Sequence, residues 1–283
     1  MAIRLITDSA SDLLPQEAAA LGVVHMPLRV RFDTEEYLDA VDLSHRRFYE
    51  KLVESDTLPT TSQIPPAEFS DVFRKITEQG DTAVAITLSG ALSGTYQSAC
   101  IAAEDFPGRV FVVDSRNVCV GQRILVLRAL ELVQQGMDAP TLVEQLNREK
   151  QDIRVMAVLD TLEYLKKGGR ISAATALAGG LLSIKPVVAV ADGEVVMLGR
   201  ARGSKNSNNL LRKFMEQDGG VHFARPYCVA YSGLSDALLQ KYMADNEDLW
   251  RTNEKSLPIA TVGCVIGTHV GPNAIAVGFF SNK

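Results

Sequence analysis

Residues 84–99 read VAITLSGALSGTYQSA, and this stretch decides the fold. An apolar run over 84–86 ends in a cluster of glycines and hydroxyl side chains, after which a helical pattern begins. The pattern predicts a buried strand that passes through a polar turn into a helix. Such a turn suits an anion, because glycines let the backbone approach a ligand and the first N–H groups of a helix lack internal partners. The loop carries no base of its own, since no Lys, His, Asp or Glu lies between Asp81 and Glu104.

Ordinary turn chemistry is the alternative interpretation of the same stretch. Ser93 suits a helix N-cap, and Gly90 and Gly94 suit turn positions. The stretch contains more hydroxyl side chains than one cap requires. A cap and an anion site therefore both stay open on these residues alone.

Composition bounds the class of protein. The 283 residues are enough for two domains, and 46% hydrophobic with 22% charged residues is ordinary for a soluble globular chain. A formal net charge of −5 argues against a general nucleic-acid binder, which needs a basic face. No apolar run approaches the length of a membrane span, and the first residues, MAIRLITDSA, are typical of a first strand and not of a signal peptide.

The cysteines indicate the compartment. All four are far apart, form no C-x-x-C pair and have apolar or small neighbours. This pattern predicts buried free thiols in a cytoplasmic protein without disulfides or structural zinc.

The first half of the chain, 1–152, is predicted to be one α/β domain. Short β-branched runs alternate with helical patterns, which is typical of a parallel sheet with helices on both faces. An extended, proline-bounded loop is expected over 58–66. The expected strands are Ile3–Thr7, Val23–Phe32, Thr82–Thr87 and Val110–Asp114, and the expected helices are Leu13–Leu21, His45–Val53, Ala67–Glu78, Ser93–Ala103, Gly121–Gln135 and Thr141–Glu149.

The second half, 153–283, is predicted to be an α/β domain with a mixed sheet. Asp192-Gly193 is a strong hairpin signal, which makes two of its strands antiparallel. The expected strands are Arg154–Val158, Pro186–Ala191, Glu194–Leu198, Tyr227–Tyr231, Ile259–Ile266 and Ala274–Phe280, and the expected helices are Leu162–Lys167, Ser172–Leu182, Asn208–Glu216 and Ala237–Met243.

Polar loops at strand ends are the candidate binding elements, because ligands of open α/β sheets collect outside the carboxyl ends of the strands. Four such loops are present: Thr7–Ser9, Thr60–Gln63, Ser89–Thr95 and Thr268–Pro272. In the Thr7–Ser9 loop, the polar side chains are also suited simply to stabilising a turn through hydrogen bonds to the backbone.

Two basic side chains, His269 and Arg170, could each belong to a binding site or serve only a structural role. His269 stands in an apolar run that ends in Gly271-Pro272, where a structural histidine bonded to a backbone carbonyl is the alternative. Arg170 follows two lysines and two glycines. It suits either a clamp for a carboxylate or phosphate, or a solvated helix end.

The sequence motifs give little support to an enzymatic function. Ser93 and His269 are a conceivable acyl- or phosphoryl-transfer pair, but Ser93 lacks the G-x-S-x-G spacing and no acid accompanies His269 in the sequence. No His, Asp or Glu cluster has metal-ligand spacing, and no G-x-G-x-x-G follows a strand. We therefore expect no catalytic residues, no metal and no cofactor.

The loops, taken together and in order, resemble the DegV family of fatty-acid-binding proteins, and the resemblance covers essentially the whole chain. The matching stretches are Thr7-Asp8-Ser9 with Asp12-Leu13, Thr61-Ser62-Gln63 with Pro65, Ser89–Ala99, Val113-Asp114-Ser115, Tyr164–Ile171, Lys185-Pro186 and Ile266–Pro272.

The resemblance implies a non-catalytic, two-domain α/β carrier that holds a long-chain fatty acid such as palmitate in an apolar tunnel. Thr61 and Ser93 would hold the carboxylate, and the residues around it would be Ser62, Gly94, Thr95, His269, Arg170 and Gly271. An open polar pocket at His269 would instead indicate a regulatory or sugar-binding protein on the same scaffold.

The resemblance also implies a partner, a separate ATP-binding fatty acid kinase subunit that phosphorylates the bound carboxylate. Arg200 and Arg202 would belong to the docking surface for this subunit. The family often continues this segment with further basic residues, whereas 204–209 reads SKNSNN here and is mostly neutral. The predicted docking face is therefore less cationic than in the family pattern.

Overall fold

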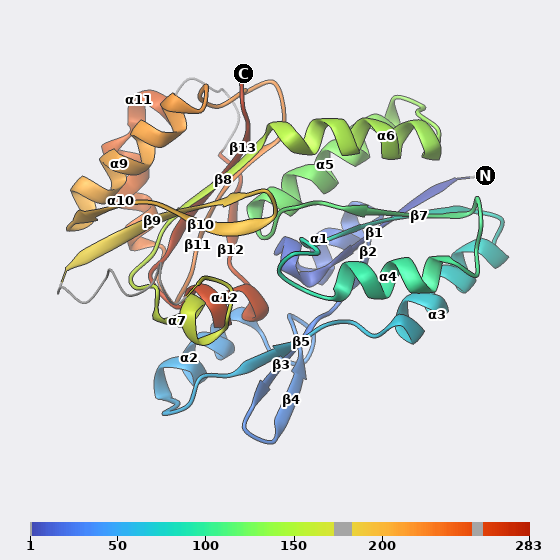
Figure 1. Cartoon of the computed structure of the whole chain (residues 1–283), viewed down its shortest axis with the longest axis horizontal. Helices are drawn as coiled ribbons and strands as arrows, with labels where there is room; N and C mark the ends of the chain where they lie inside the picture. Colours follow the sequence, from blue (N-terminus) through green and yellow to red (C-terminus); the bar gives the residue numbers. More distant parts are fainter. Residues whose placement is uncertain (1, 173–182, 251–256) are drawn as a thin grey trace.

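The computed structural model describes residues 2–172, 183–250 and 257–283. A four-stranded parallel sheet forms the half that contains the N-terminus (Figure 1). Its strands, in spatial order, are β2 (Val24–Met26), β1 (Ile3–Asp8), β6 (Thr82–Thr87) and β7 (Val110–Asp114). Every residue of β6 is buried, as expected for an inner strand covered on both faces.

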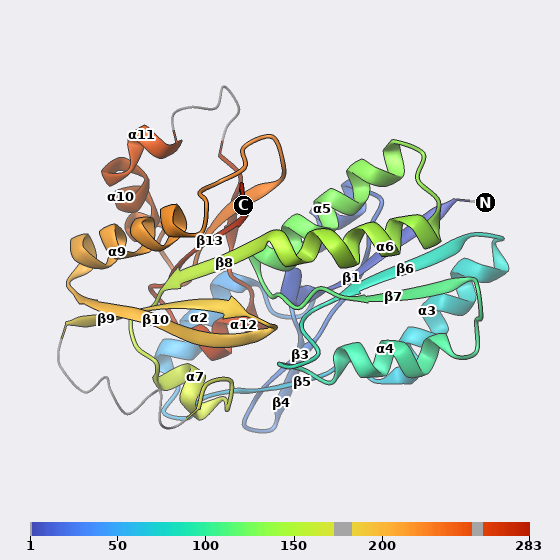
Figure 2. The same cartoon turned by 45° about the horizontal axis from the view of Figure 1, so that its top comes forward.

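Helices cover both faces of this sheet, as the alternating pattern predicted. Helices α3 (Pro66–Glu78) and α4 (Thr95–Ala103) pack on one face, and α5 (Val120–Gln134) and α6 (Ala139–Glu149) pack on the other (Figure 2). Helix α1 (Pro15–Ala20) lies beside the edge strand β2. Asp138 caps α6 by accepting a hydrogen bond from the Thr141 backbone N–H at 2.9 Å.

A six-stranded mixed sheet forms the other half. Its spatial order is β10 (Glu194–Arg202), β9 (Ile184–Ala191), β8 (Ile153–Val158), β13 (Ile275–Phe280), β11 (Tyr227–Tyr231) and β12 (Ile259–Thr261). Only the β11–β12 pair is parallel. Asp192 and Gly193 both have positive φ angles, 52° and 85°, and this primed turn joins β9 to β10 as predicted. The predicted fold class, with a parallel sheet followed by a mixed one, is confirmed.

Helix α5 is shared by the two sheets. It contacts β1 and β6 of the parallel sheet and β8, β11 and β13 of the mixed sheet, whose other face is covered by α9 (Ser204–Gln217), α10 (Ala237–Asp245) and α11 (Glu247–Trp250). The approach is close, since a Cβ at Gly121 would lie 2.3 Å from the Val155 side chain. One hydrophobic core consequently runs through residues of both halves. The sheets divide at residue 152/153, whereas the division into two domains at that point stays a prediction.

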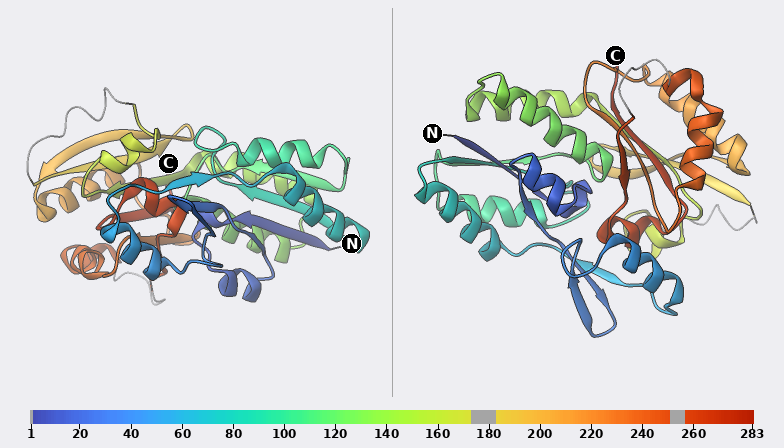
Figure 3. Two further views of the ribbon diagram at one scale, coloured as in Figure 1. Left: turned by 90° about the horizontal axis from the view of Figure 1, so that it is seen from below. Right: turned by 180° about the vertical axis from the view of Figure 1, so that it is seen from behind.

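A third, antiparallel sheet lies next to both. It consists of β4 (Glu35–Leu38), β3 (Arg29–Phe32) and β5 (Thr60–Ser62), and it borders on α2 (His45–Glu54), α7 (Glu163–Lys167) and α12 (Cys264–Val270), as the views from below and behind show (Figure 3). Two 3-10 turns, η1 (Ser9–Ser11) and η2 (Lys150–Asp152), complete the described elements.

This small sheet corrects two sequence-based expectations. The predicted strand Val23–Phe32 is broken around Pro27 into β2 and β3, which belong to different sheets. Pro27 has no N–H to donate, so it does not continue a ladder. The predicted loop 58–66 contains β5, which pairs with β3 through Thr60, Thr61 and Ser62.

The predicted strand Ile259–Ile266 is wrong beyond Thr261, because α12 begins at Cys264. The first five residues of α12 are all buried, so the helix has a continuous apolar run. Periodicity alone does not distinguish such a buried helix from a buried strand. Gly267 allows α12 to approach α2, since a Cβ there would lie 2.6 Å from the Tyr49 hydroxyl. His269 is therefore in the last turn of a helix and not in a loop between two strands.

Three further predictions concern the cysteines, the helix expected over 172–182 and membrane-spanning segments. All four cysteines are free, with Cys119, Cys228 and Cys264 buried and Cys100 half-buried. The helix predicted over 172–182 lies outside the described residues except for Ser172. Among the helices of the described ranges, none has both the length and the apolar character needed to cross a bilayer.

Candidate functional site

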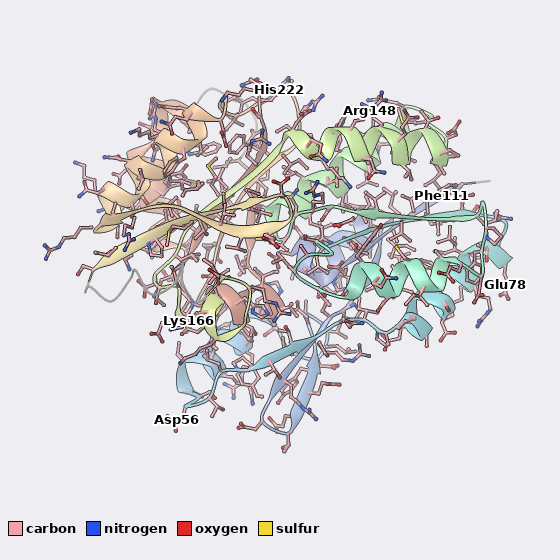
Figure 4. The ribbon with its side chains drawn as sticks, in the orientation of Figure 1. Asp56, Glu78, Phe111, Arg148, Lys166 and His222 are labelled. Carbon is pink, nitrogen blue, oxygen red and sulfur yellow. The ribbon has the colours of Figure 1, made fainter. Side chains whose placement is uncertain are left out.

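The predicted site residues meet at a cavity of about 300 Å³ between the small sheet, α4, α7 and α12. Lys166, on the outer side of α7, marks this corner of the molecule in Figure 4. Six of the predicted residues, from four segments of the chain, line the cavity, namely Thr61, Ser62, Ser93, Gly94, Arg170 and His269. The rest of its wall consists of Leu28, Gln63, Leu88, Leu92, Val118, Leu165, Val195, Val265, Ile266 and Val270.

A hydrogen bond between Thr61 and His269 joins two walls of the cavity. Pairing of β5 with β3 places Thr61 opposite Val30, and its Oγ1 lies 3.0 Å from Nε2 of His269. Burial, together with the nearby positive charge of Arg170, lowers the pKa of His269 to about 4. The neutral ring is packed so closely that a Cβ at Gly168 would lie 2.2 Å from its Nδ1. Its Nδ1 has no hydrogen-bond partner among the described residues.

We expect His269 to make the folded state less stable in acid. In the unfolded chain, His269 binds a proton as the pH falls below its ordinary pKa of 6.5. In the folded protein, the same ring binds a proton only near pH 4. The free energy of unfolding contributed by this residue should therefore fall as pH drops from about 6.5 to 4 and level off below. Chemical unfolding of wild type and His269→Gln across this range measures the effect. The wild type should lose more stability than the variant, and parallel curves would contradict the assignment.

Ser93 stands one residue before Gly94, the N-cap of α4, so the predicted N-cap is off by one residue. Its Oγ accepts a hydrogen bond from the Thr95 backbone N–H at 3.3 Å, at the first turn of α4, and it also faces the cavity. The same Oγ lies 3.0 Å from Oγ1 of Thr95, which is fully buried behind it and does not line the cavity. Thr95 thus supports Ser93 instead of contacting a ligand there itself.

Gln63 lies in the cavity wall although it was not among the predicted site residues. Its side-chain amide covers Gly94, where a Cβ would lie 2.0 Å from Oε1, and its Nε2 donates to Oγ of Ser98 at 2.9 Å. The glycine is needed for this close approach. The signal was present in the sequence, because Gln63 adjoins Thr61 and Ser62 in the same loop.

Arg170 is the one formally charged side chain in the wall of the cavity, as far as the described residues go. Its guanidinium donates to the backbone carbonyls of Leu92 and Gly168, which fixes it beside the β6–α4 loop. With His269 neutral, the cavity has a net positive charge and several hydroxyl groups. This combination suits an anion.

A second, wholly apolar cavity of about 60 Å³ adjoins the first. The two share the side chains of Val118, Leu165, Val195, Ile266 and Val270. The remaining wall is formed by Cys119, Val155, Ala157, Leu159, Val188, Ala189, Val190, Val262, Ala274 and Ala276. A largely apolar chamber that carries hydroxyl groups and one cation, and that borders on a wholly apolar one, is suited to an amphipathic anion.

The structure does not bring every predicted residue to the site. Gly271 is buried beside Tyr164, outside the cavity wall, and Arg200 and Arg202 are exposed on β10. In the Thr7–Ser9 loop, Asp8 accepts hydrogen bonds from the backbone N–H groups of Ala10 and Leu88, so this loop braces the scaffold.

Comparison with known proteins places the chain in a family. The profile of the family described as "Uncharacterised protein, DegV family" matches residues 2–282. A DegV domain-containing protein of Deinococcus radiodurans is 38% identical in an alignment of 282 positions that covers 98% of this chain and 98% of that one.

Solved structures agree with the sequence match. A DegV family protein from Thermus thermophilus, described by its fatty acid binding, is 34% identical with a TM-score of 0.87, over 99% of this chain and 100% of that one. A stearic acid-binding protein from Eubacterium ventriosum is 28% identical with a TM-score of 0.85, over 98% of this chain and 97% of that one. This chain therefore belongs to the DegV family.

Proposed function

We propose that this protein binds a long-chain fatty acid, such as palmitate, with the carboxylate in the polar cavity and the acyl chain in the apolar one. The observation that carries the proposal is the shared wall between a cationic, hydroxyl-lined chamber and a chamber lined by apolar side chains. The relatives from T. thermophilus and E. ventriosum, described as fatty acid-binding and stearic acid-binding, support it.

The hydroxyl groups are arranged to donate to a carboxylate. If His269 carries its proton on Nε2, it donates to Thr61, and the Thr61 hydroxyl is then free to donate to the ligand. Thr95 can donate to Ser93 in the same way. Arg170 adds a positive charge at the cavity wall, and the neutral donors keep the ligand ionised without a base.

The acyl chain supplies most of the affinity in this proposal. Each buried methylene contributes roughly 0.8 kcal/mol before the costs of binding. The apolar cavity is small without a ligand, about 60 Å³, so its side chains would have to move apart around a long chain. The carboxylate contacts then fix the orientation of the ligand.

A carrier fits the geometry better than the alternative enzyme built on Ser93 and His269. The His269 Nε2 is engaged with Thr61, and no carboxylate pairs with its Nδ1 in the described part of the chain. A histidine that acts as a general base needs its nucleophile within hydrogen-bond reach and a group that orients the ring. We propose no catalytic role for either residue.

Titration with matched lipids tests the proposed function. Palmitate should displace a fluorescent fatty acid analogue, whereas the alcohol of equal chain length should displace it much more weakly, because only the acid presents a carboxylate to Arg170 and the hydroxyl groups. Equal displacement by both lipids, or by neither, would overturn the proposal.

The proposal extends to presentation of the bound acid to a separate, ATP-binding kinase subunit in the cytoplasm. Arg200 and Arg202 are exposed on β10, the edge strand of the mixed sheet, where a partner can reach them. We expect Arg200→Glu with Arg202→Glu to retain fatty acid but to reduce acyl-phosphate formation by such a subunit. A charge-reversed variant that supports full phosphorylation would exclude these two residues from docking.

A further inference from the structure

A cluster of three potential metal ligands lies at the other end of α12 from His269. Asp39 follows β4, His45 is the first residue of α2 and Cys264 is the first residue of α12. Each offers one ligand atom, and these atoms lie within 4.8 Å of one another. The positions are far apart in the sequence, which explains why spacing alone indicated no metal site.

The cluster is buried, and hydrogen bonds fix the position of its carboxylate. Asp39 is 1% exposed, Cys264 is fully buried and His45 is 9% exposed. The Asp39 carboxylate accepts hydrogen bonds from the backbone N–H groups of Cys264 and Val265 and from Oγ of Ser9. These bonds orient it toward the start of α12 and leave it further lone pairs.

The other two side chains lie beside this carboxylate. Nε2 of His45 lies 3.9 Å from Oδ1 of Asp39, beyond hydrogen-bond distance. Burial lowers the pKa of His45 despite the nearby Asp39 and Glu17, so its imidazole is neutral and has a lone pair to offer. The Cys264 thiol lies 3.4 Å from the carbonyl oxygen of Leu43 and also forms a hydrogen bond with the Asp39 carboxylate.

We propose that Asp39, His45 and Cys264 form a zinc site. One oxygen, one nitrogen and one sulfur ligand are a donor set that zinc accepts, with the fourth position open to a solvent molecule. In a tetrahedral zinc site the ligand atoms lie roughly 3.5 Å apart, so the three side chains must close in by about an ångström.

The charge balance favours a divalent ion in this buried place. Cys264 must lose its proton, which passes to solvent, and the resulting thiolate and the Asp39 carboxylate together offset both charges of the zinc ion. A neutral complex limits the cost of placing the ion away from water. Because zinc binds the thiolate and not the thiol, zinc binding should release one proton.

Zinc at this position would join three segments of the chain. It would hold the first turns of α2 and α12 to the segment after β4, where Gly267 already brings the two helices into close contact. His269 stands five residues beyond Cys264, roughly 7.5 Å along the helix axis. The site is thus distinct from the cavity, and the inference does not depend on fatty acid binding.

Cobalt substitution tests the site directly. Chelator-treated full-length protein, kept reduced and incubated to equilibrium with Co²⁺, should develop the charge-transfer band of a thiolate–cobalt bond at one equivalent. Cys264→Ala should abolish the band, and Cys100→Ala, which removes a half-buried thiol outside the cluster, should retain it. Absence of the band in wild type, or its survival in Cys264→Ala, would overturn the proposal.

Thermal unfolding provides a measurement that does not need the cysteine variant to fold. Zn²⁺ should raise the Tm of the wild-type protein, since an ion that binds only the folded state stabilises it. His45→Gln, at the rim of the cluster, should reduce the shift, while circular dichroism checks its fold. An unchanged wild-type Tm at saturating Zn²⁺ would contradict the site.

Discussion

Ala157→Phe is expected to abolish tight binding of long-chain fatty acids. Ala157 lies on β8, is partly exposed to the apolar cavity and stands opposite Ala276 in the sheet. A phenyl ring there would fill the space proposed for the acyl chain. Excluding about four methylenes at roughly 0.8 kcal/mol each costs about 3 kcal/mol, or about a hundredfold in affinity. Competition binding with palmitate measures the loss.

A matched substitution separates blockage from unfolding. Ala157→Val adds two methyl groups instead of a phenyl ring and should weaken palmitate binding much less, while a short-chain acid should bind similarly to all three proteins. Overpacking by the phenyl ring costs stability of about 1–3 kcal/mol, so circular dichroism should confirm that the variant is folded. Undiminished palmitate binding by a folded Ala157→Phe protein would place the acyl chain elsewhere.

Thr61→Ala and Ser93→Ala are expected to weaken fatty acid binding separately. Each removes a hydroxyl donor from the polar cavity and leaves a buried carboxylate short of one hydrogen bond. The cost should be about 1–3 kcal/mol per variant, roughly five- to 150-fold in affinity. Competition binding with palmitate on each purified variant measures it.

Thr60→Ala is the matched control for these two variants. Thr60 is the exposed neighbour of Thr61 on β5, and it does not line the cavity. Its substitution should leave affinity unchanged. If both Thr61→Ala and Ser93→Ala also retained wild-type affinity, the carboxylate would not be bound where we propose.

The parts of the fold that follow from local chemistry were predicted from the sequence. The run 84–99 became β6, its polar turn and α4, and Asp192-Gly193 became the β9–β10 hairpin. In each case the deciding interactions lie within a few residues, so periodicity and turn preference suffice.

The parts that depend on contacts distant in sequence were not predicted. Helix α12 can be apolar because α2 and the small sheet cover it. Gly267 allows the close contact with α2. Strand β5 exists because β3, about 30 residues earlier in the chain, offers it an edge. Short polar or buried segments take their structure from such partners, which local patterns do not reveal.

Most of the residues predicted for the binding site lie around one cavity, whereas their role in binding stays a prediction. Thr61, Ser93 and His269 were selected from loops and do line one cavity, although His269 reaches it from a helix. Gly271 and Thr95 lie behind the wall because their surroundings depend on Tyr164 and Ser93. The metal-ligand cluster was missed because Asp39, His45 and Cys264 meet only after folding.

Mass spectrometry of the purified protein tests the central proposal most directly. The intact protein under native conditions should have the added mass of one long-chain fatty acid, and organic extraction should release that acid for identification. Protein that was stripped of lipid should recover the same added mass when palmitate is supplied. Ligand-free protein that takes up no palmitate would contradict the proposal that this chain is a fatty acid carrier.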